Sequence, residues 1–316
     1  MTGAALRGAL EQGLDGFEPR AVTAAVRRLV AGYRSDSSAD LSDPVTVAAY
    51  AAYRMPATYA AVRAVLAQIP QLSATSLLDL GGGTGAAAWA VTEAVPELGS
   101  ITVTDRSAPA LEFGRRLAAA APYPALRQAR WARAELSATW PAAELITASY
   151  VLGELDLTTR ETVAAALAGT EATVLIVEPG TPAGYRRVLA ARDQLLARGH
   201  RVLAPCPHSA TCPLAATADW CHFAVRLDRS ALHRRVKSAE LGYEDEKFAY
   251  VATAPEGHAV AAGRVVRHPQ IRKGLVGLTV CRRDGHVAQV PVGRSRPAYR
   301  AARAVRWGDP WPPAGG

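Results

Sequence analysis

The alternation of apolar runs and helical segments between residues 71 and 180 limits the folds that this chain can adopt. Short apolar runs, SLLDL, ITVTD, ELITAS and TVLIV, are separated by segments with helical patterns such as AAAWAVTEAV and TRETVAAALAG. A strand that is repeatedly followed by a helix is typical of a doubly wound α/β sheet with parallel strands. We therefore expect a doubly wound core over residues 71–200.

The segments on either side of this core differ from it in pattern. Residues 1–70 have the small apolar and charged alternation of amphipathic helices, and Asp43-Pro44 is typical of a helix start. After residue 200 come a cysteine-rich stretch, a basic helical segment at 230–239, and β-type runs with a hairpin signal at Asp284-Gly285. The sequence thus predicts three parts: a helical region (1–70), the core (71–200) and a Cys-rich, β-rich lobe (201–316).

The first residues contain no uninterrupted apolar segment of the kind found in signal peptides, and no run of eighteen apolar residues lacks charges. These observations predict a cytoplasmic protein that does not span a membrane. In that compartment thiols stay reduced, so several cysteines in one chain indicate metal binding more than disulfides.

Charge is distributed unevenly along the chain. Residues 1–180 hold 14 basic and 18 acidic residues, a net of −4, whereas residues 181–316 hold 22 and 10, a net of +12. A basic half of this kind is expected of a surface that binds a polyanion, here RNA. The alternative is a solvated, charge-rich surface without a ligand.

The segment LDLGGGTG is a candidate cofactor site. Asp79 lies at the end of a predicted strand, and Gly81, Gly83 and Gly85 lie in the turn to the next helix. Glycine is favoured where the backbone approaches a ligand closely or adopts positive φ. Asp105 ends the next predicted strand, where a carboxylate can accept hydrogen bonds from ribose hydroxyls. A glycine-rich turn without a ligand is the alternative.

The four cysteines of the chain form a second candidate site. Three lie within sixteen residues and the fourth is sixty residues further along; they are Cys206, Cys212, Cys221 and Cys281. Four thiolates are the usual ligands of a structural zinc ion or an iron–sulfur cluster. The spacing lacks the paired C-x2–4-C units of zinc ribbons and suits a cluster better. Zinc and four unrelated buried thiols remain alternatives, and His208 and His222 are candidates for supporting contacts.

The glycine segment resembles the first motif of class I S-adenosylmethionine-dependent methyltransferases. This resemblance implies a Rossmann-like fold in which Gly81, Gly83 and Gly85 approach the cofactor, Asp79 positions its amino end and Asp105 binds its ribose. After the fourth strand, amino-group methyltransferases have an Asn/Asp-Pro-Pro-aromatic motif, whereas this chain has ASYV. Tyr150 in that segment is a further candidate for cofactor binding. No catalytic residue is assigned, and the methyl acceptor stays open.

A longer series of segments resembles the mitochondrial small-ribosomal-subunit assembly methyltransferase-like family and its bacterial homologues. The matching segments include YAAYRMPATYAAV, LLDLGGGTGAAAWA, SYVLGEL, VEPGTPAGYRRVLAAR, the CPH…CP…WCHF stretch, RRVKSAELGYEDEKFAYV and RKGLVGLTVCRRDG. The resemblance implies a [4Fe-4S] cluster on the four cysteines and association with small-subunit ribosomal RNA during assembly.

Three functions follow from these expectations. The first is an RNA-binding, methyltransferase-like protein of ribosome assembly with a structural cluster, whose methyl transfer to ribosomal RNA is inferred only. The second is a non-catalytic RNA-binding assembly factor that retains the cofactor pocket. The third is a small-molecule methyltransferase with a structural metal, against which the basic half of the chain argues.

Overall fold

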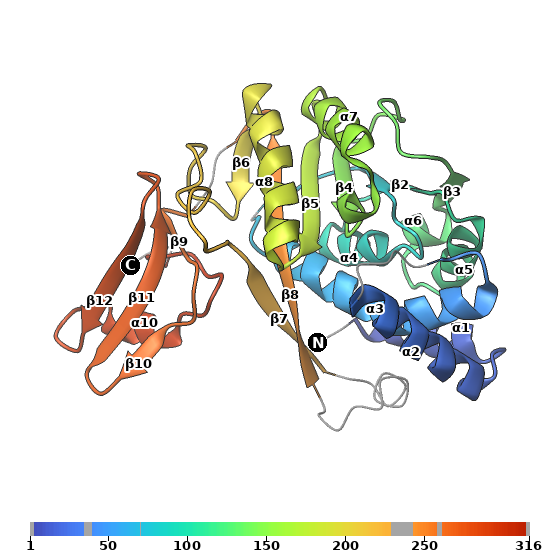
Figure 1. The fold of residues 1–316 in the computed structure, drawn as a ribbon, viewed down its shortest axis with the longest axis horizontal. Helices are drawn as coiled ribbons and strands as arrows, with labels where there is room; N and C mark the ends of the chain where they lie inside the picture. Colours follow the sequence, from blue (N-terminus) through green and yellow to red (C-terminus); the bar gives the residue numbers. More distant parts are fainter. Residues whose placement is uncertain (1–2, 35–39, 70, 229–242, 258–260, 314–316) are drawn as a thin grey trace. The chain divides into compact units, whose positions relative to one another are not determined.

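The computed structural model describes residues 3–34, 40–69, 71–228, 243–257 and 261–313, which form two compact units (Figure 1). The first unit contains residues 1–67, 71–163 and 225–246, and the second contains residues 68–70, 164–224 and 247–316. The predicted basic helix at 230–239 lies outside the described residues. The three-part division expected from the sequence stays a prediction, because these units are defined by contacts and not by independent folding.

Three helices at the start of the chain lie side by side in the first unit (Figure 1); they are α1 (Ala4–Leu14), α2 (Pro19–Arg34) and α3 (Pro44–Leu66). Helix α3 begins at the predicted residue because the Asp43 carboxylate accepts a hydrogen bond from the Thr46 amide at 2.8 Å. Such a cap satisfies one of the amides that the first turn leaves free. Apolar side chains of α2 and α3, among them Val26 and Ala49, form a buried cluster between the two helices.

The first unit also contains parallel strands, in the order β3-β2-β1-β4. These strands are β1 (Ser76–Leu80), β2 (Ser100–Asp105), β3 (Arg130–Arg133) and β4 (Leu145–Ser149). The segments between and after them form α4 (Ala86–Ala94), α5 (Ala108–Ala119), α6 (Pro124–Arg127), a 3-10 turn η1 (Leu152–Glu154) and α7 (Leu157–Ala168). This strand order is that of a Rossmann-like half, which confirms the expected α/β fold.

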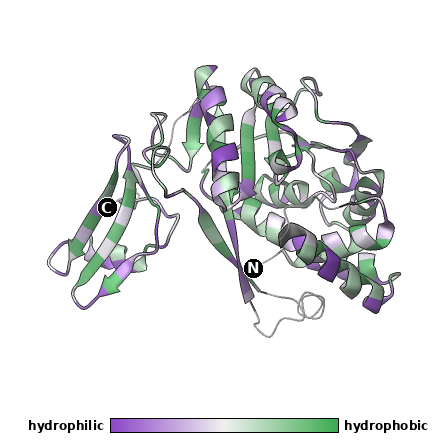
Figure 2. Ribbon diagram, in the orientation of Figure 1, coloured by the Kyte–Doolittle hydropathy of each residue, from purple (hydrophilic) through white to green (hydrophobic). Residues whose placement is uncertain are grey.

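Strands in the second unit run antiparallel, in the order β5-β8-β6, so strand directions in this protein are mixed and not only parallel. The elements are β5 (Thr173–Pro179), α8 (Pro182–Ala197), β6 (Arg201–Ala204) and β8 (Tyr243–Ala254), which itself begins in the first unit. Strand β5 is almost entirely hydrophobic (Figure 2), and its residues from Val174 to Glu178 are buried. β7 (Phe223–Asp228) follows the cysteine-rich stretch.

The C-terminal part of the second unit is the predicted β-rich segment. It contains β9 (Gly263–Val265), β10 (Gln270–Arg272), β11 (Leu275–Arg282), β12 (Val287–Gly293) and α10 (Tyr299–Ala304). The predicted hairpin at Asp284-Gly285 is confirmed: Gly285 has a φ of 82°, and Arg282 and His286 are joined by a backbone hydrogen bond. Among the described residues, none of the helices combines the length and hydrophobicity needed to cross a bilayer.

Candidate functional site

The glycine-rich turn between β1 and α4 favours glycine at all three predicted positions, because Gly81, Gly83 and Gly85 each have a positive φ. Gly81 has a φ of 62°, and a Cβ there would lie 2.3 Å from Cγ2 of Val151. Gly85 precedes the first residue of α4 with a φ of 83°, and a Cβ there would lie 2.6 Å from the Trp131 ring. Both positions are strained for any other residue. Glycine therefore lets the backbone of the turn pass close to Val151 and Trp131 at the end of β1.

A cleft of about 500 Å³ opens beside this turn, entirely within the first unit. Its volume is in the range of small-molecule sites. Four of the six predicted cofactor residues line it: Gly81, Gly83, Asp105 and Tyr150. Gly85 and Asp79 do not line it, and the roles predicted for all six residues stay predictions.

Asp105 is held in one orientation at the end of β2. Its Oδ2 accepts a hydrogen bond from the Gly83 amide at 2.9 Å, and its Oδ1 accepts one from the Ser107 amide at 2.8 Å. Partial burial raises the pKa of Asp105, while these two amides act to lower it. Each carboxylate oxygen has a second lone pair, so the group can still accept hydrogen bonds from a ligand in the cleft.

Asp79 lies behind the glycine turn and not in the cleft. It is fully buried; its Oδ1 accepts a hydrogen bond from the Thr147 hydroxyl at 2.7 Å, and its Oδ2 has no partner. Burial raises the pKa of Asp79 to about 7, because a carboxylate loses hydration there. Asp79 could therefore act on the amino end of a cofactor only through the glycine turn that lies between them.

The buried Asp79 predicts a pH-dependent stability. Its pKa in the folded chain is raised above the ordinary value of 3.8, so the folded state retains a proton that the unfolded state loses. We therefore expect the contribution of this group to stability to decrease between about pH 4 and pH 7, by up to about 1.4 kcal/mol for each pH unit. Urea denaturation across this range should show a weaker pH dependence for Asp79→Asn. An unchanged dependence would contradict the buried, protonated state.

Sequence reasoning missed the side chains that orient Tyr150. Tyr150 has a φ of 59°, and its hydroxyl donates a hydrogen bond to Oε1 of Glu246 at 2.8 Å. Arg54 of α3 pairs with the same carboxylate at 3.0 Å and lies 5.1 Å from the centre of the Tyr150 ring. Glu246 lies 192 residues from Arg54 and 96 residues from Tyr150 in the sequence, so no local pattern connects the three residues. The sequence also suggests that the acidic segment containing Glu246 forms a structural charge network with the basic residues Arg234, Arg235 and Lys237, but those three residues lie outside the described residues.

All four cysteines line one cavity of about 40 Å³ in the second unit. Cys206 follows β6, Cys212 and Cys221 lie in the stretch before β7, and Cys281 lies in β11. Among the described residues, no group of three or more histidine, cysteine or acidic side chains has the arrangement of a metal site. The metal-binding character of the lobe is therefore not confirmed, and ligand roles for the four thiols stay predictions.

Burial favours the protonated form of three of these thiols unless a cation balances their charge. It raises the pKa of Cys206, raises that of Cys281 to about 12, and raises that of Cys221 well above its ordinary value. Neighbouring cysteines add to each shift, since thiolates so close together repel one another. A bound metal centre would remove this penalty, because coordination deprotonates a thiol.

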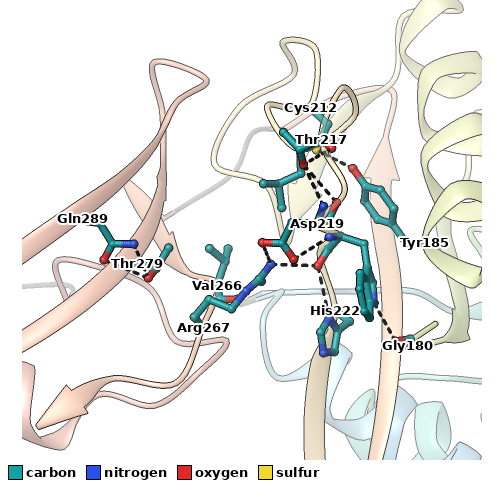
Figure 3. Close-up of polar contacts among 12 residues, drawn as sticks. Gly180, Tyr185, Cys212, Thr217, Asp219, His222, Val266, Arg267, Thr279 and Gln289 are labelled. Carbon is teal, nitrogen blue, oxygen red and sulfur yellow. Dashed lines mark hydrogen bonds and ion pairs between the residues drawn. The ribbon is translucent and has the colours of Figure 1, made fainter. Parts of the chain in front are cut away.

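Polar side chains approach the sulfur atoms from several directions. The Tyr185 hydroxyl of α8 lies 3.2 Å from Sγ of Cys212 (Figure 3), and Nε2 of His208 lies 3.5 Å from Sγ of Cys281. Two buried arginines, Arg192 and Arg264, also line the cavity, each 3% exposed. Of the two predicted supporting histidines, His208 thus contacts a cysteine, whereas His222 packs between tryptophan rings.

A family model described as "Mitochondrial small ribosomal subunit Rsm22" matches residues 44–312. The chain belongs to this family. It is 28% identical over 290 residues to the human "Ribosome assembly protein METTL17, mitochondrial", an alignment that covers 82% of this chain and 61% of the human protein. It is 25% identical over 182 residues to "Rsm22-cox11 tandem protein 2, mitochondrial" of Schizosaccharomyces pombe, covering 44% of this chain and 24% of that protein. The chain thus spans less than two thirds of the length of these relatives.

The comparison corrects one expectation of this Rsm22-family chain. A cytoplasmic location was predicted, but the matching family and both relatives are named as mitochondrial, so that prediction is wrong. The error arose because the absence of a signal peptide and of membrane spans does not identify a compartment.

Solved methyltransferase structures resemble this Rsm22-family chain weakly. The glycopeptide N-methyltransferase MtfA in complex with S-adenosylmethionine is 12% identical, with a TM-score of 0.42, covering 63% of this chain and 94% of that one. The O-methyltransferase NcsB1 is 24% identical, with a TM-score of 0.41, covering 52% and 55%. At these TM-scores neither likeness says what this chain binds.

Proposed function

We propose that this chain binds S-adenosylmethionine in the cleft of its first unit, holds a [4Fe-4S] cluster on its four cysteines, and acts on or with small-subunit ribosomal RNA during ribosome assembly. The observation that carries the proposal is that four cysteines, separated by up to 75 residues, line one cavity beside two buried arginines.

The surroundings of the thiols suit an anionic metal centre. Four thiolates around zinc or an iron–sulfur core have a net negative charge, which Arg192 and Arg264 offset from within the protein. Nε of Arg192 and Nδ1 of His208 are buried without a hydrogen-bond partner, as expected where an acceptor belongs in the cavity. A volume of about 40 Å³ exceeds the space that one water molecule needs, which favours a group of several atoms over a single ion.

The residues around a bound cluster would have different roles. Cys206, Cys212, Cys221 and Cys281 would hold the iron atoms, and Tyr185 would donate a hydrogen bond to the Cys212 sulfur. When bound, the cluster supplies strong cross-links between β11 and the loops around it. A structural role of this kind is expected to stabilise the lobe that the ligands connect.

The cleft supports the cofactor assignment. Backbone groups of Gly81 and Gly83 face it without side chains, and Asp105 offers free lone pairs at a position where this fold holds a ribose. When bound, S-adenosylmethionine supplies a transferable methyl group. The alternative is a non-catalytic assembly factor that retains this pocket. The contacts of Tyr150 with Glu246 and Arg54 favour this alternative, because they occupy a side chain that would otherwise be available to a methyl acceptor.

Two features support a ribosomal RNA partner. Residues 181–316 have a net charge of +12, and the family and the human relative are named for the small ribosomal subunit and for ribosome assembly. Crosslinking in cells, with mapping of RNA modifications in a deletion strain, tests the proposal. Crosslinks to small-subunit RNA with one lost methyl group indicate catalysis, and crosslinks without a lost modification indicate the non-catalytic alternative. No crosslink to this RNA would refute the partner.

Replacing Asp105 with alanine should weaken S-adenosylmethionine binding. Loss of hydrogen bonds to a charged acceptor typically costs about 1.5–3 kcal/mol, which corresponds to roughly 10- to 100-fold in affinity. Isothermal calorimetry on the full chain measures this change directly.

Asp43→Ala is the matched control, because Asp43 also accepts a backbone hydrogen bond in the first unit but does not line the cleft. It should lower stability by about 1 kcal/mol through loss of a helix cap and leave the affinity unchanged. Equal affinities for the wild type and Asp105→Ala would refute the pocket assignment.

A further inference from the structure

Four aromatic and histidine rings form a connected series in the second unit, away from the cleft. Trp220 stacks on His222, with ring centres 5.3 Å apart and planes inclined by 21°. His222 meets the edge of Trp307 at 4.7 Å, and Trp307 meets His268 at 4.6 Å. We call Trp220, His222, Trp307 and His268 the ring ladder.

Backbone pairing and hydrogen bonds hold the ladder together from three separate segments. The Gly308 amide donates to the Val265 carbonyl at 2.8 Å, which places the segment of Trp307 beside the segment of His268. The indole N–H of Trp220 donates to the Gly180 carbonyl at 3.0 Å. The rings are therefore preorganised, and a ligand would not have to order them.

Packing of the hydrophobic core does not account for this arrangement. His268 is exposed, and the residues Trp220, His222 and Trp307 are each partly buried. The core cluster of this part of the unit contains Trp311 but not Trp307. Arg267 lies beside the ladder, because it donates to the Trp220 carbonyl at 3.2 Å. It also pairs with Asp219 (Figure 3).

Several arginines lie in the sequence just before Trp307 of the ladder. Between residues 286 and 308 there is no acidic residue, and the five arginines there are all exposed: Arg294, Arg296, Arg300, Arg303 and Arg306. None of them forms an ion pair with another residue that the structure describes. Arg300 and Arg303 are three residues apart on α10 and so lie on one side of it, and Arg306 is adjacent to Trp307.

We propose that the ring ladder and these arginines form a binding site for single-stranded RNA, in which unpaired bases stack on the rings and the arginines contact the phosphates. Aromatic faces accept any base, whereas bases inside an A-form helix are already stacked and not accessible to them. Exposed guanidinium groups suit phosphate oxygens. This inference rests on the proposed function for the origin of the RNA, namely small-subunit ribosomal RNA, and adds which part of the chain binds it and in what form.

Anisotropy measurements with the full, anaerobically purified chain test the site. The probes are a labelled 12-nucleotide single strand, a duplex of equal length, and a strand of equal charge without bases. The wild type should prefer the single strand over both other probes. His268→Ala and Trp307→Leu should each weaken single-strand binding by roughly tenfold, the usual effect of losing one stacking partner, and leave binding of the baseless strand unchanged.

The arginines have a different expected signature. Arg300→Glu with Arg303→Glu should weaken binding of every probe and reduce the slope of log affinity against log salt by about 1.4, since each single-strand phosphate contact contributes about 0.7. Two controls match these changes outside the site: Arg20→Glu with Arg27→Glu on α2, and His286→Ala, whose side chain is 81% exposed. Neither control should change single-strand affinity, and thermal unfolding confirms that each variant is folded.

The outcomes separate this inference from the proposed function. Wild-type affinity in both His268→Ala and Trp307→Leu, or equal binding of strands with and without bases, overturns the ladder site even if the chain crosslinks to ribosomal RNA. Crosslinking in cells without any single-strand binding in solution also overturns the site and leaves the partner standing. Absence of both overturns the two proposals together.

Discussion

Replacing Cys281 with serine is expected to give a colourless protein that has lost its iron and unfolds much more easily. Cys281 is the one predicted ligand in β11, whereas the other three lie between residues 206 and 221. Its loss would therefore release the β-hairpin from the cysteine-rich stretch. Serine is a hard, weakly acidic ligand and binds the iron of such a cluster much more weakly than a thiolate does. Loss of a structural metal belongs to the largest single-residue effects, so we expect a destabilisation of more than about 4 kcal/mol.

Iron and sulfide analysis of anaerobically purified protein, the visible spectrum, and thermal unfolding measure this result. Cys212→Ser should behave in the same way, because its sulfur lines the same cavity. Thr279→Ser, two residues from Cys281 on β11 and outside the cavity, is the control and should retain iron. Stoichiometric zinc without iron in the wild type would reject the cluster but keep a four-thiol site. Full iron content in Cys281→Ser would reject Cys281 as a ligand.

Local signals in the sequence predicted much of the fold. Asp43-Pro44 starts α3, LDLGGGTG forms the turn between β1 and α4, and Asp284-Gly285 closes the hairpin of β11 and β12. Each of these features depends on residues only a few positions apart, where backbone preference decides the structure. The antiparallel pairing of β5 and β8 joins residues 69 to 79 positions apart, and no local pattern specifies it.

The sequence indicated the chemically distinctive residues of the candidate sites, but it did not indicate the residues that surround them. Four clustered cysteines and a glycine cluster between a strand and a helix are distinctive patterns, so their roles can be predicted from residue type and spacing. Arginine is abundant in this chain, so the sequence could not distinguish the buried Arg192 and Arg264 from the many exposed ones. Burial arises from tertiary packing, and it is also what placed Asp79 behind the turn instead of in the cleft.

A buried ion pair at the start of α8 is expected to control both stability and the cysteine cavity. Glu178 of β5 is fully buried, and one of its carboxylate oxygens accepts a hydrogen bond from Nε of Arg187 at 2.6 Å. Arg187→Ala removes a charged partner from this buried carboxylate. Such a loss typically costs about 3–5 kcal/mol, far more than the loss of an exposed pair. Because α8 also holds Tyr185 and Arg192 against the cavity, the variant should lose iron faster under a chelator.

Chemical denaturation and the rate of iron release measure the two effects. Arg186→Ala is the matched control, since the neighbouring arginine is exposed and should change stability by less than about 0.5 kcal/mol. Glu178→Gln combined with Arg187→Met should recover part of the loss, because it removes the buried charge together with its partner. If Arg187→Ala is no less stable than Arg186→Ala, the pair does not anchor α8. If it is less stable but releases iron at the wild-type rate, α8 contributes to the fold of the second unit without supporting the metal centre.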